Sequence, residues 1–481
     1  MLIKNLTNKR PYFLLLFTAM LMPAILISLG ENIFLAMIAV FVFFIFLLVF
    51  YKWPWALIIL LILVPLNFFY FLDITFLPTI KIVAGIRVDF LDLLILCVFI
   101  VGVMRFFIRR TLPLFGLELL FLLVSIGLSL AWGLYQGYID FDVALGGLRP
   151  LFAFIFYISL IPILYKSRDK RRLVNLLMGV SIIAMGIQVY EVLFGALVLP
   201  TSTPWYVNGN ISLSVGDVIT PYLWNRAPAI LFLVYNICLA RWFIAQKKIS
   251  LLLAAAIFIC VALTHIRSML IFICLESLIL AVIVYFSYSR SRGLVLTSIF
   301  FAILLGTLLI VFGTATDSVG VARLKTLMDP IGDSSFNTRI RATQLFYEYF
   351  SASPLVGHGP GSVSLIEKKY GIWSTDVGLI SSLAGYGLLV FFSLSFLLYK
   401  VFKNLKYVLR LEKNTLEIAD AYGILGFFFL ALISSLSLQN YFFISPWNYS
   451  TAIALVMLDI LVRNIRRQEI PFMNPHAEKE N

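Results

Sequence analysis

The sequence contains one long polar segment, and the rest of the chain is arranged around it. Residues 334–387 read SSFNTRIRATQLFYEYFSASPLVGHGPGSVSLIEKKYGIWSTDVGLISSLAGYG. On both sides of this segment the chain consists mostly of apolar runs, short turns and basic clusters. We therefore expect the apolar runs to form the body of the fold and to hold the polar segment over a lipid-facing site.

Composition assigns the chain to the membrane class. Of its 481 residues, 62% are hydrophobic and 13% are charged, and the mean hydropathy is +1.00. A soluble domain carries about 25% charged and roughly 45–50% apolar residues, so the soluble class is excluded. The four cysteines lie in apolar runs without C-x-x-C spacing, so neither a disulfide framework nor a zinc site is expected. We predict an all-α polytopic membrane protein.

Apolar runs long enough to cross a bilayer, about 20 residues each, predict about fourteen membrane spans. They are 11–29, 33–51, 55–72, 89–108, 113–134, 147–165, 172–194, 227–245, 249–264, 268–287, 293–313, 376–402, 419–438 and 447–462. Residues 1–313 would hold the first eleven spans and an outer loop at 195–226. Residues 314–375 would form a long outer loop, residues 376–462 the last three spans, and residues 463–481 a disordered cytoplasmic tail.

The basic residues orient these spans. The chain carries 37 Lys and Arg and a net charge of +13. With the N-terminus inside, every inner loop has at least one basic residue and most of the 37 lie on the inner side, as the positive-inside rule requires. Both termini are therefore expected in the cytoplasm. The excess charge is explained by topology, so a nucleic-acid partner is not expected.

The first part of the polar segment, 336–350, has the pattern of an amphipathic helix. At 100° per residue, its apolar face is predicted to hold Phe336, Ile340, Phe346, Tyr347 and Phe350. Arg341 and Glu348 fall on the opposite face and are expected to be solvated. Arg339 falls at the margin of the apolar face, pointing toward the membrane bundle. An anionic partner and a lipid headgroup fit such an arginine equally well.

The second part contains the candidate bases. In PLVGHGPG (354–361), Gly357, Gly359 and Gly361 permit positive φ or close backbone approach, and their N–H groups could cradle an anion. His358 is a candidate base, a phosphate partner or a surface residue. Asp376, before a helix rich in small residues, is a candidate N-cap or a base aimed into a cavity.

Other basic side chains begin predicted spans on the outer side. His265 and Arg267 occupy a hairpin with almost no loop, and Arg149 and Arg226 each begin a further span. Arginine has the fork geometry that suits a diphosphate, so these arginines and Arg339 could converge on one. Each alone is more often an interface anchor. Separately, Glu276 is the one carboxylate deep in a predicted span, which makes it a functional candidate, although pairing with a buried polar group is the simpler explanation.

These features together resemble the O-antigen ligase and polymerase superfamily. The likeness extends over residues 147–398 and includes the THIRS hairpin at 264–268, an arginine-bearing helix in a long outer loop, PLVGHGPG, and DVGLISSLAGYGL at 376–388. The resemblance implies a GT-C-like fold and an inverting, metal-independent glycosyltransferase without a cofactor, on the outer face of the bacterial inner (cytoplasmic) membrane. Its donor would be a glycan on undecaprenyl diphosphate. By position, Arg226 and Arg267 resemble the diphosphate-binding arginines.

The resemblance leaves three functions in competition. Ligases of this kind typically show a histidine shortly before the small-residue helix, whereas this chain has Asp376 there and its histidine at His358, which favours a repeat-unit polymerase. A ligase that transfers glycan to lipid A core or protein is the alternative. A transporter or flippase is third, because the charges gather at one outer face. The expected partners are lipid-linked donor and acceptor glycans and the bilayer, with a chain-length regulator and a flippase as candidate protein partners.

Overall fold

The computed structural model describes most of the predicted spans. It describes residue 45 and residues 47–63, 80–81, 87–88, 90–148, 152–164, 166–194, 228–263, 267–288, 295–296, 334–370, 377–437 and 447–473. The predicted spans at 11–29, most of 33–51 and of 293–313, and the outer loop at 195–226 lie outside these residues.

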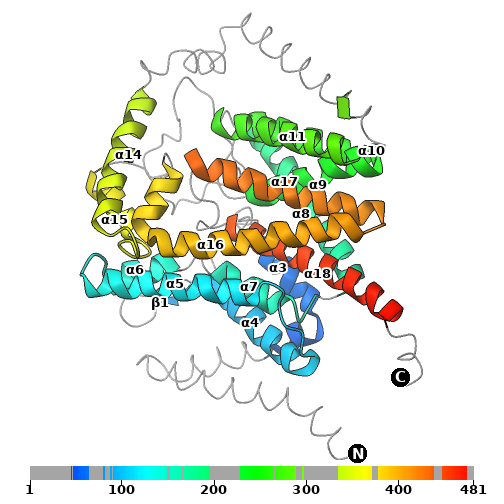
Figure 1. Cartoon of the computed structure of the whole chain (residues 1–481), viewed down its shortest axis with the longest axis horizontal. Helices are drawn as coiled ribbons and strands as arrows, with labels where there is room; N and C mark the ends of the chain where they lie inside the picture. Colours follow the sequence, from blue (N-terminus) through cyan, green and yellow to red (C-terminus); the bar gives the residue numbers. More distant parts are fainter. Residues whose placement is uncertain are drawn as a thin grey trace, which may run out of the picture.

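The described elements are helical apart from one pair of short strands (Figure 1). In chain order they are α3 (Pro54–Leu63), β1 (Ile80–Lys81), β2 (Arg87–Val88), α4 (Phe90–Arg109), α5 (Gly116–Tyr135), α6 (Phe141–Leu148), α7 (Phe152–Leu160), α8 (Ser167–Phe194), α9 (Pro228–Ala245), α10 (Lys248–Leu263), α11 (Arg267–Ser287), α14 (Ser334–Ala352), α15 (Ser362–Tyr370), α16 (Gly378–Leu411), α17 (Thr415–Ser437) and α18 (Trp447–Met473). The two strands pair antiparallel, with Ile80 opposite Val88.

Three of the described helices are long and apolar enough to cross a membrane, namely α5, α16 and α17 as far as Ser435. Shorter apolar stretches occur in α9, α10 and α11. The membrane α-helical class is therefore confirmed, whereas the total of fourteen spans stays a prediction.

Helix α9 forms the centre of the bundle. Every residue from Ile230 to Ala240 is buried, as expected for a helix that is apolar on all sides. It packs against α8, α10, α11, α17 and α18. On α17, a Cβ at Gly423 would lie 2.5 Å from Ile237 Cα, so glycine permits this close approach.

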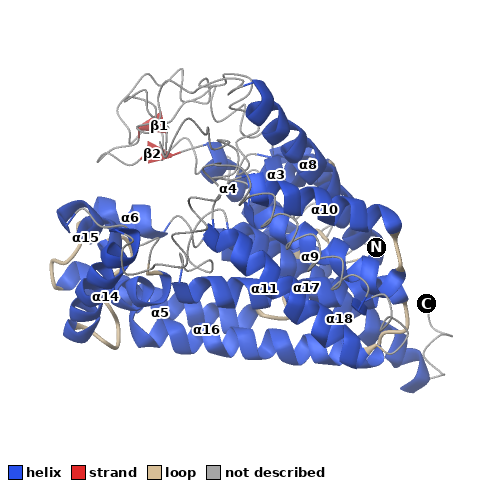
Figure 2. Ribbon diagram, turned by 90° about the horizontal axis from the view of Figure 1, so that it is seen from above, coloured by secondary structure: helices blue, strands red, loops and turns tan. Residues whose placement is uncertain are grey.

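Helices α5 and α16 run antiparallel along one side of the bundle. Lys400 Nζ lies 2.6 Å from Glu118 Oε1, and the Ser125 and Ser393 hydroxyl oxygens are 2.7 Å apart. Figure 2 shows α6, α14 and α15 gathered at the end of this pair where α16 begins. Leu411, where α16 ends, is 24 residues beyond Gly387, which at 1.5 Å per residue is about 36 Å. This length exceeds the roughly 30 Å of a bilayer's hydrocarbon core.

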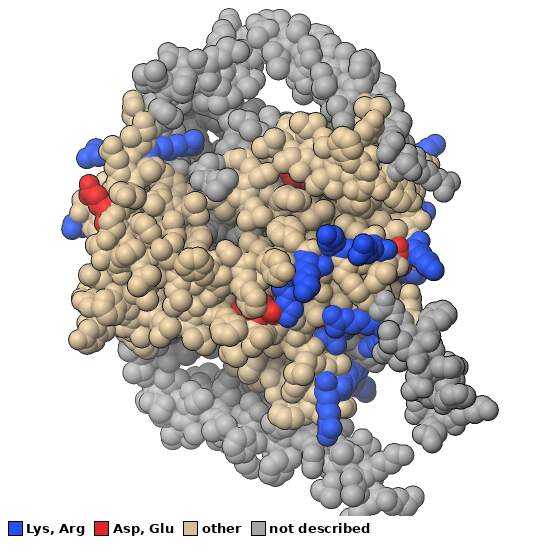
Figure 3. All heavy atoms as spheres, in the orientation of Figure 1, with Lys and Arg blue, Asp and Glu red and all other residues tan. Residues whose placement is uncertain are grey.

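Basic side chains gather at the end of the bundle where α16 ends and α18 finishes, which we call the basic end (Figure 3). There Arg463 donates to the carbonyl of Leu112, and Arg109 donates to Pro162 O at 2.8 Å. Lys170 and Arg171 begin α8 beside the α16–α17 turn. The opposite end, with α6, α14 and α15, we call the histidine end. Basic residues also occur at the histidine end, on α14 and α15, namely Arg339, Arg341, Lys368 and Lys369. The described charge is thus concentrated at the basic end without being confined to it, a bias that agrees with the positive-inside pattern.

The structure corrects three predicted boundaries. The predicted span at 147–165 is wrong in its bounds, because α7 has nine residues and ends before Pro162. Proline lacks the backbone N–H that the interior of a helix requires. Helix α16 continues past 402 to Leu411. The disordered tail at 463–481 is wrong for its first part, because α18 continues to Met473 with Arg463 paired to Asp459 one turn earlier.

Candidate functional site

The segment 353–361, which we call the glycine loop, is bonded into a kink of α16. At Gly387 the helix has φ 71° and ψ 175°, which interrupts its i to i−4 ladder. Leu388 N and Leu389 N donate instead to Pro354 O and Leu355 O, at 2.9 and 3.0 Å. The carbonyls that they would have used, Ala384 and Gly385, accept from the loop. The helix thus exchanges two of its own hydrogen bonds for four with the loop.

Close backbone approach is what the loop glycines provide. Gly357, Gly359 and Gly361 have φ of 69°, 95° and 90°, which confirms the prediction of positive φ. A Cβ on Gly357 would lie 2.5 Å from Gly385 O. A side chain there would therefore separate the loop from α16.

The predicted anion cradle is wrong for three N–H groups of the loop. Gly357 N donates to Ser353 O at 2.9 Å, and Gly359 N donates to Gly385 O at 2.9 Å. His358 N donates to Ala384 O at 3.0 Å. These donors satisfy backbone acceptors inside the protein, as buried N–H groups generally do, so they cannot also bind a phosphate.

His358 is a buried residue, which overturns the surface interpretation. Its side chain is 4% exposed and lies between Tyr138 and Tyr349, with ring centroids 4.4 and 5.4 Å away. Its Nδ1 lies 3.2 Å from Ala384 O. Because a carbonyl oxygen can only accept, Nδ1 is assigned the proton. Nε2, which has no hydrogen-bond partner among the described residues, then carries the lone pair.

The charge state of His358 suits a general base. Burial lowers the pKa of His358 below its usual value, and the hydrogen bond to the Ala384 carbonyl opposes this shift. The imidazole is therefore neutral at pH 7. A neutral imidazole in a fixed tautomer can take a proton at Nε2.

Two tyrosines of this site were not predicted from the sequence. Tyr349 lies on α14, three residues after Phe346, and this spacing places both on the buried face. Tyr138 lies in the turn between α5 and α6, and no local pattern marks it. The segment reaches His358 because Gly133 lets α5 approach the loop backbone.

The predicted helix at 336–350 is confirmed as α14, but its buried face is only partly as predicted. Ala342 and Phe346 are buried and Phe350 is half-buried, whereas Ile340 and Tyr347 are exposed. The buried side chains pack against Ile366, Val377 and Ala384. These packing partners determine which side of α14 is buried, and that side differs from the one that is most apolar by sequence. The side chain of Phe336 is outside the described part.

The charged residues of α14 are placed by the same packing. Arg341 and Glu348 are exposed, as predicted, and Arg339 is half-buried. Arg339 precedes Tyr349 by ten residues, about 15 Å along the helix. The described structure therefore does not bring Arg339 next to His358.

The remaining site predictions cannot be placed. Arg149, Arg226, His265 and Asp376 lie outside the described residues. Arg267 is the first residue of α11, and its side chain is not described. Convergence of the arginines on a diphosphate stays a prediction, and so does the role of Asp376.

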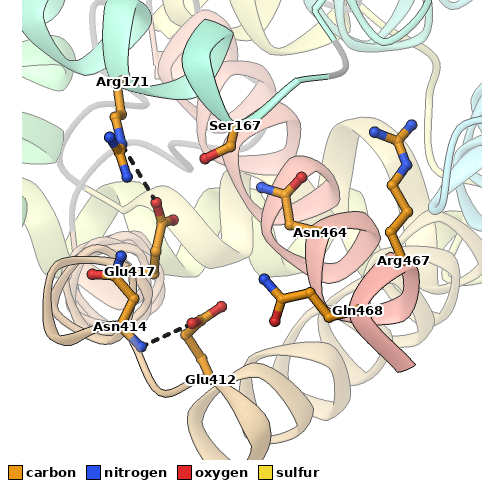
Figure 4. A pocket seen from close by; sticks show the side chains of 8 residues that line it. All are labelled: Ser167, Arg171, Glu412, Asn414, Glu417, Asn464, Arg467 and Gln468. Atoms are coloured by element: carbon orange, nitrogen blue, oxygen red, sulfur yellow. Dashed lines mark hydrogen bonds and ion pairs between the residues drawn. The ribbon is translucent and has the colours of Figure 1, made fainter. Parts of the chain in front are cut away.

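A second polar region lies at the basic end (Figure 4). A cavity of about 250 Å³ is lined by Ser167, Arg171, Glu412, Asn414, Glu417, Asn464, Arg467 and Gln468. Behind its wall, the fully buried Lys170 binds Glu417 and, at 2.5 Å, Asp420 Oδ2. Arg241 Nε binds Asp420 Oδ1 at 2.7 Å. Buried charges need such partners, so this network joins α8, α9 and α17.

Comparison with known proteins adds no family to these observations. No family model matches the chain, and no curated protein matches it significantly. The motifs and the geometry around His358 are therefore the features that indicate a function.

Proposed function

We propose that this chain is a membrane glycosyltransferase that polymerises undecaprenyl-diphosphate-linked repeat units on the outer face of the bacterial inner membrane. One observation carries the proposal. A buried histidine, fixed through Nδ1 to Ala384 and flanked by two tyrosines, lies at the end of the bundle opposite the basic end. If basic residues face the cytoplasm, His358 faces the periplasm, where such glycans are assembled.

The proposed reaction is an inverting displacement. His358 Nε2 accepts the proton of the acceptor sugar's hydroxyl while that oxygen attacks the anomeric carbon of the donor. The new glycosidic C–O bond forms as the bond from that carbon to the diphosphate breaks, and undecaprenyl diphosphate leaves. A base in hydrogen-bond reach contributes about 10²–10⁴-fold.

Arginines have the second role in this proposal. The departing diphosphate gains negative charge, which preorganised cations stabilise. Arg226 and Arg267 are the first candidates, with Arg149 and Arg339 in support. Asp376 is the other candidate base, with the same proton-accepting role as His358.

The finer topology belongs to the same proposal. We propose a GT-C-like arrangement of about fourteen spans, with both termini in the cytoplasm and residues 314–375 in the periplasm. Helices α14 and α15 belong to this loop. Their position beside the start of α16 (Figure 2) would hold the site at the membrane surface.

Purified protein with short lipid-diphosphate-linked repeat units and no other acceptor tests the proposal. We expect a ladder of longer lipid-linked products on a gel. Transfer that occurs only after a core acceptor is added would make the protein a ligase. Absence of product under both conditions, with transport of the lipid-linked units into proteoliposomes, would contradict an enzymatic role.

A further inference from the structure

Among the residues that the structure describes, one carboxyl group in the interior of the bundle has no hydrogen-bond partner, and it is far from the glycine loop in sequence. Glu276 on α11 is 0% exposed. Within the described part of the chain neither of its carboxyl oxygens has a hydrogen-bond partner. Helix α11 packs here against α9, α10 and α17.

A second buried polar group beside Gly426 offers an acceptor to this acid. Asn236 on α9 is also 0% exposed, and its Nδ2 donates to Phe232 O at 2.9 Å. Its Oδ1 has no donor among the described residues. Both Asn236 Oδ1 and Glu276 Oε1 lie against Gly426 of α17. A Cβ added at Gly426 would overlap Asn236 Oδ1 and would lie 2.7 Å from Glu276 Oε1.

Because both oxygens lie against the same Cβ position, they are at most about 5 Å apart. Two unprotonated oxygens this close in an apolar interior repel. A proton on Glu276 converts one of them into a donor and satisfies both. An ionised carboxylate with no cation would instead carry the full cost of a buried charge. The local geometry therefore favours the neutral acid.

The other buried carboxylates differ from Glu276 in having a basic partner. Glu118 binds Lys400 at 2.6 Å, Asp420 binds Lys170 and Arg241, and Asp459 binds Arg463. Those pairs hold charge in the bundle. Glu276 has no such pair in the described structure.

The titratable groups of the packed helices do not replace that partner. They are Tyr235, Cys238 and Arg241 on α9, Lys248 and Cys260 on α10, Arg267, Cys274 and Tyr285 on α11, and Glu417, Asp420 and Tyr422 on α17. Arg241 is bound to Asp420, and Lys248 and Arg267 begin their helices. The Tyr235 hydroxyl oxygen is 2.7 Å from Ser277 Oγ.

We propose that Glu276 and Asn236 form a proton-binding site in the membrane interior, in which the protonated carboxyl group of Glu276 donates to Asn236 Oδ1. The site joins α11 to α9 across Gly426. It is independent of His358 and of the proposed transfer reaction.

Infrared spectroscopy of the full-length protein in detergent tests this site. We expect the protonated-carboxyl C=O band at pH 7 to lose one component in the Glu276→Gln variant. Glu118→Gln is the matched control, because the Glu118 carboxylate is paired with Lys400 and should contribute nothing to that band. Asn236→Ala is the second variant, in which loss of the acceptor should shift the Glu276 component to higher wavenumber.

Three results would overturn the proposal. One is a protonated-carboxyl band that is identical in wild type, Glu276→Gln and Asn236→Ala. This result would mean that Glu276 is ionised and accepts a hydrogen bond from Asn236, whose side-chain amide oxygen and nitrogen would then be exchanged. Another is loss of the wild-type component when sodium chloride replaces a bulky organic salt, which would identify a cation site. The third is an unshifted protonated-carboxyl band in Asn236→Ala. This result is sufficient by itself to overturn the proposal, even if Glu276→Gln does not fold.

Discussion

The imidazole and the backbone of His358 are both held by Ala384. His358 N donates to Ala384 O at 3.0 Å and Nδ1 lies 3.2 Å from the same oxygen. That carbonyl is available because the kink at Gly387 removes its helical donor, Leu388 N. The fold of α16 therefore determines the tautomer of the candidate base.

The first prediction concerns stability as a function of pH. Because burial lowers the pKa of His358 in the folded state, the unfolded chain binds the proton more readily. This contribution to stability is fully present above the unfolded pKa of about 6.5 and is lost as pH falls below it. We expect the thermal midpoint to fall more between pH 7.5 and 5.5 in wild type than in His358→Gln. Equal slopes would mean that His358 is not desolvated.

The second prediction concerns the kink. In Gly387→Ala the new Cβ would lie 2.5 Å from Gly357 N and Leu355 O, at a positive φ that alanine adopts at a cost of about 1 kcal/mol or more. We expect a lower thermal midpoint and release of the glycine loop, seen as faster amide exchange at residues 354–359.

Gly127→Ala on α5 is the matched control, because nothing lies within 4 Å of its Cβ position. In a helix this change should stabilise by about 0.5–1 kcal/mol. Similar destabilisation by both variants would contradict the role assigned to Gly387.

The third prediction concerns the buried network at the basic end. Lys170→Met removes the Lys170 ammonium from its buried ion pair with Glu417. Removal of one partner of a buried ion pair lowers the free energy of unfolding by about 3–5 kcal/mol. We expect a large drop in the thermal midpoint, partly restored by the double variant Lys170→Met/Glu417→Gln. Arg171→Ala, whose side chain is 64% exposed, should change stability by about 0–1 kcal/mol. Equal effects of the two single variants would show that the network is not structural.

The fourth prediction concerns the candidate diphosphate arginines. Arg226→Ala and Arg267→Ala should each reduce polymer amount by about 10²-fold or more, because a transition-state cation is lost. Membrane insertion should be normal, as measured by fractionation and by protease accessibility. Full polymer length and amount in both variants would remove these arginines from the mechanism.

The positions of several helices were predictable from the sequence because each is determined by the apolar run within the helix itself. Apolar runs of sufficient length predicted α5, α9, α11 and α17 within a few residues of their ends, since lipid requires each backbone group to bond within its own helix. Where a helix end depends on a distant partner, the prediction was wrong. Arg463 extends α18 by pairing with Asp459 and with the Leu112 carbonyl, which comes from the other half of the chain.

The candidate site was predictable in part, for a similar reason. His358 and its glycines stand out as a motif, but the bonds that hold them come from residues about thirty positions later. Ile340 and Tyr347 are exposed because α15 and α16 contact a different side of α14. The apolar pattern of α14 alone does not reveal where these contacts fall. Tyr138 reaches His358 only through the tertiary fold.

The measurement that tests the central claim most directly compares polymerisation by wild type, His358→Gln and Gln344→Ala in purified form. Gln344 is an exposed residue of α14 with no assigned role, so its variant should form the same ladder as wild type. We expect His358→Gln, folded by its thermal midpoint, to extend lipid-linked repeat units about 10²–10⁴-fold more slowly. A folded His358→Gln protein that forms the ladder at the wild-type rate would contradict the assignment of His358 as the base.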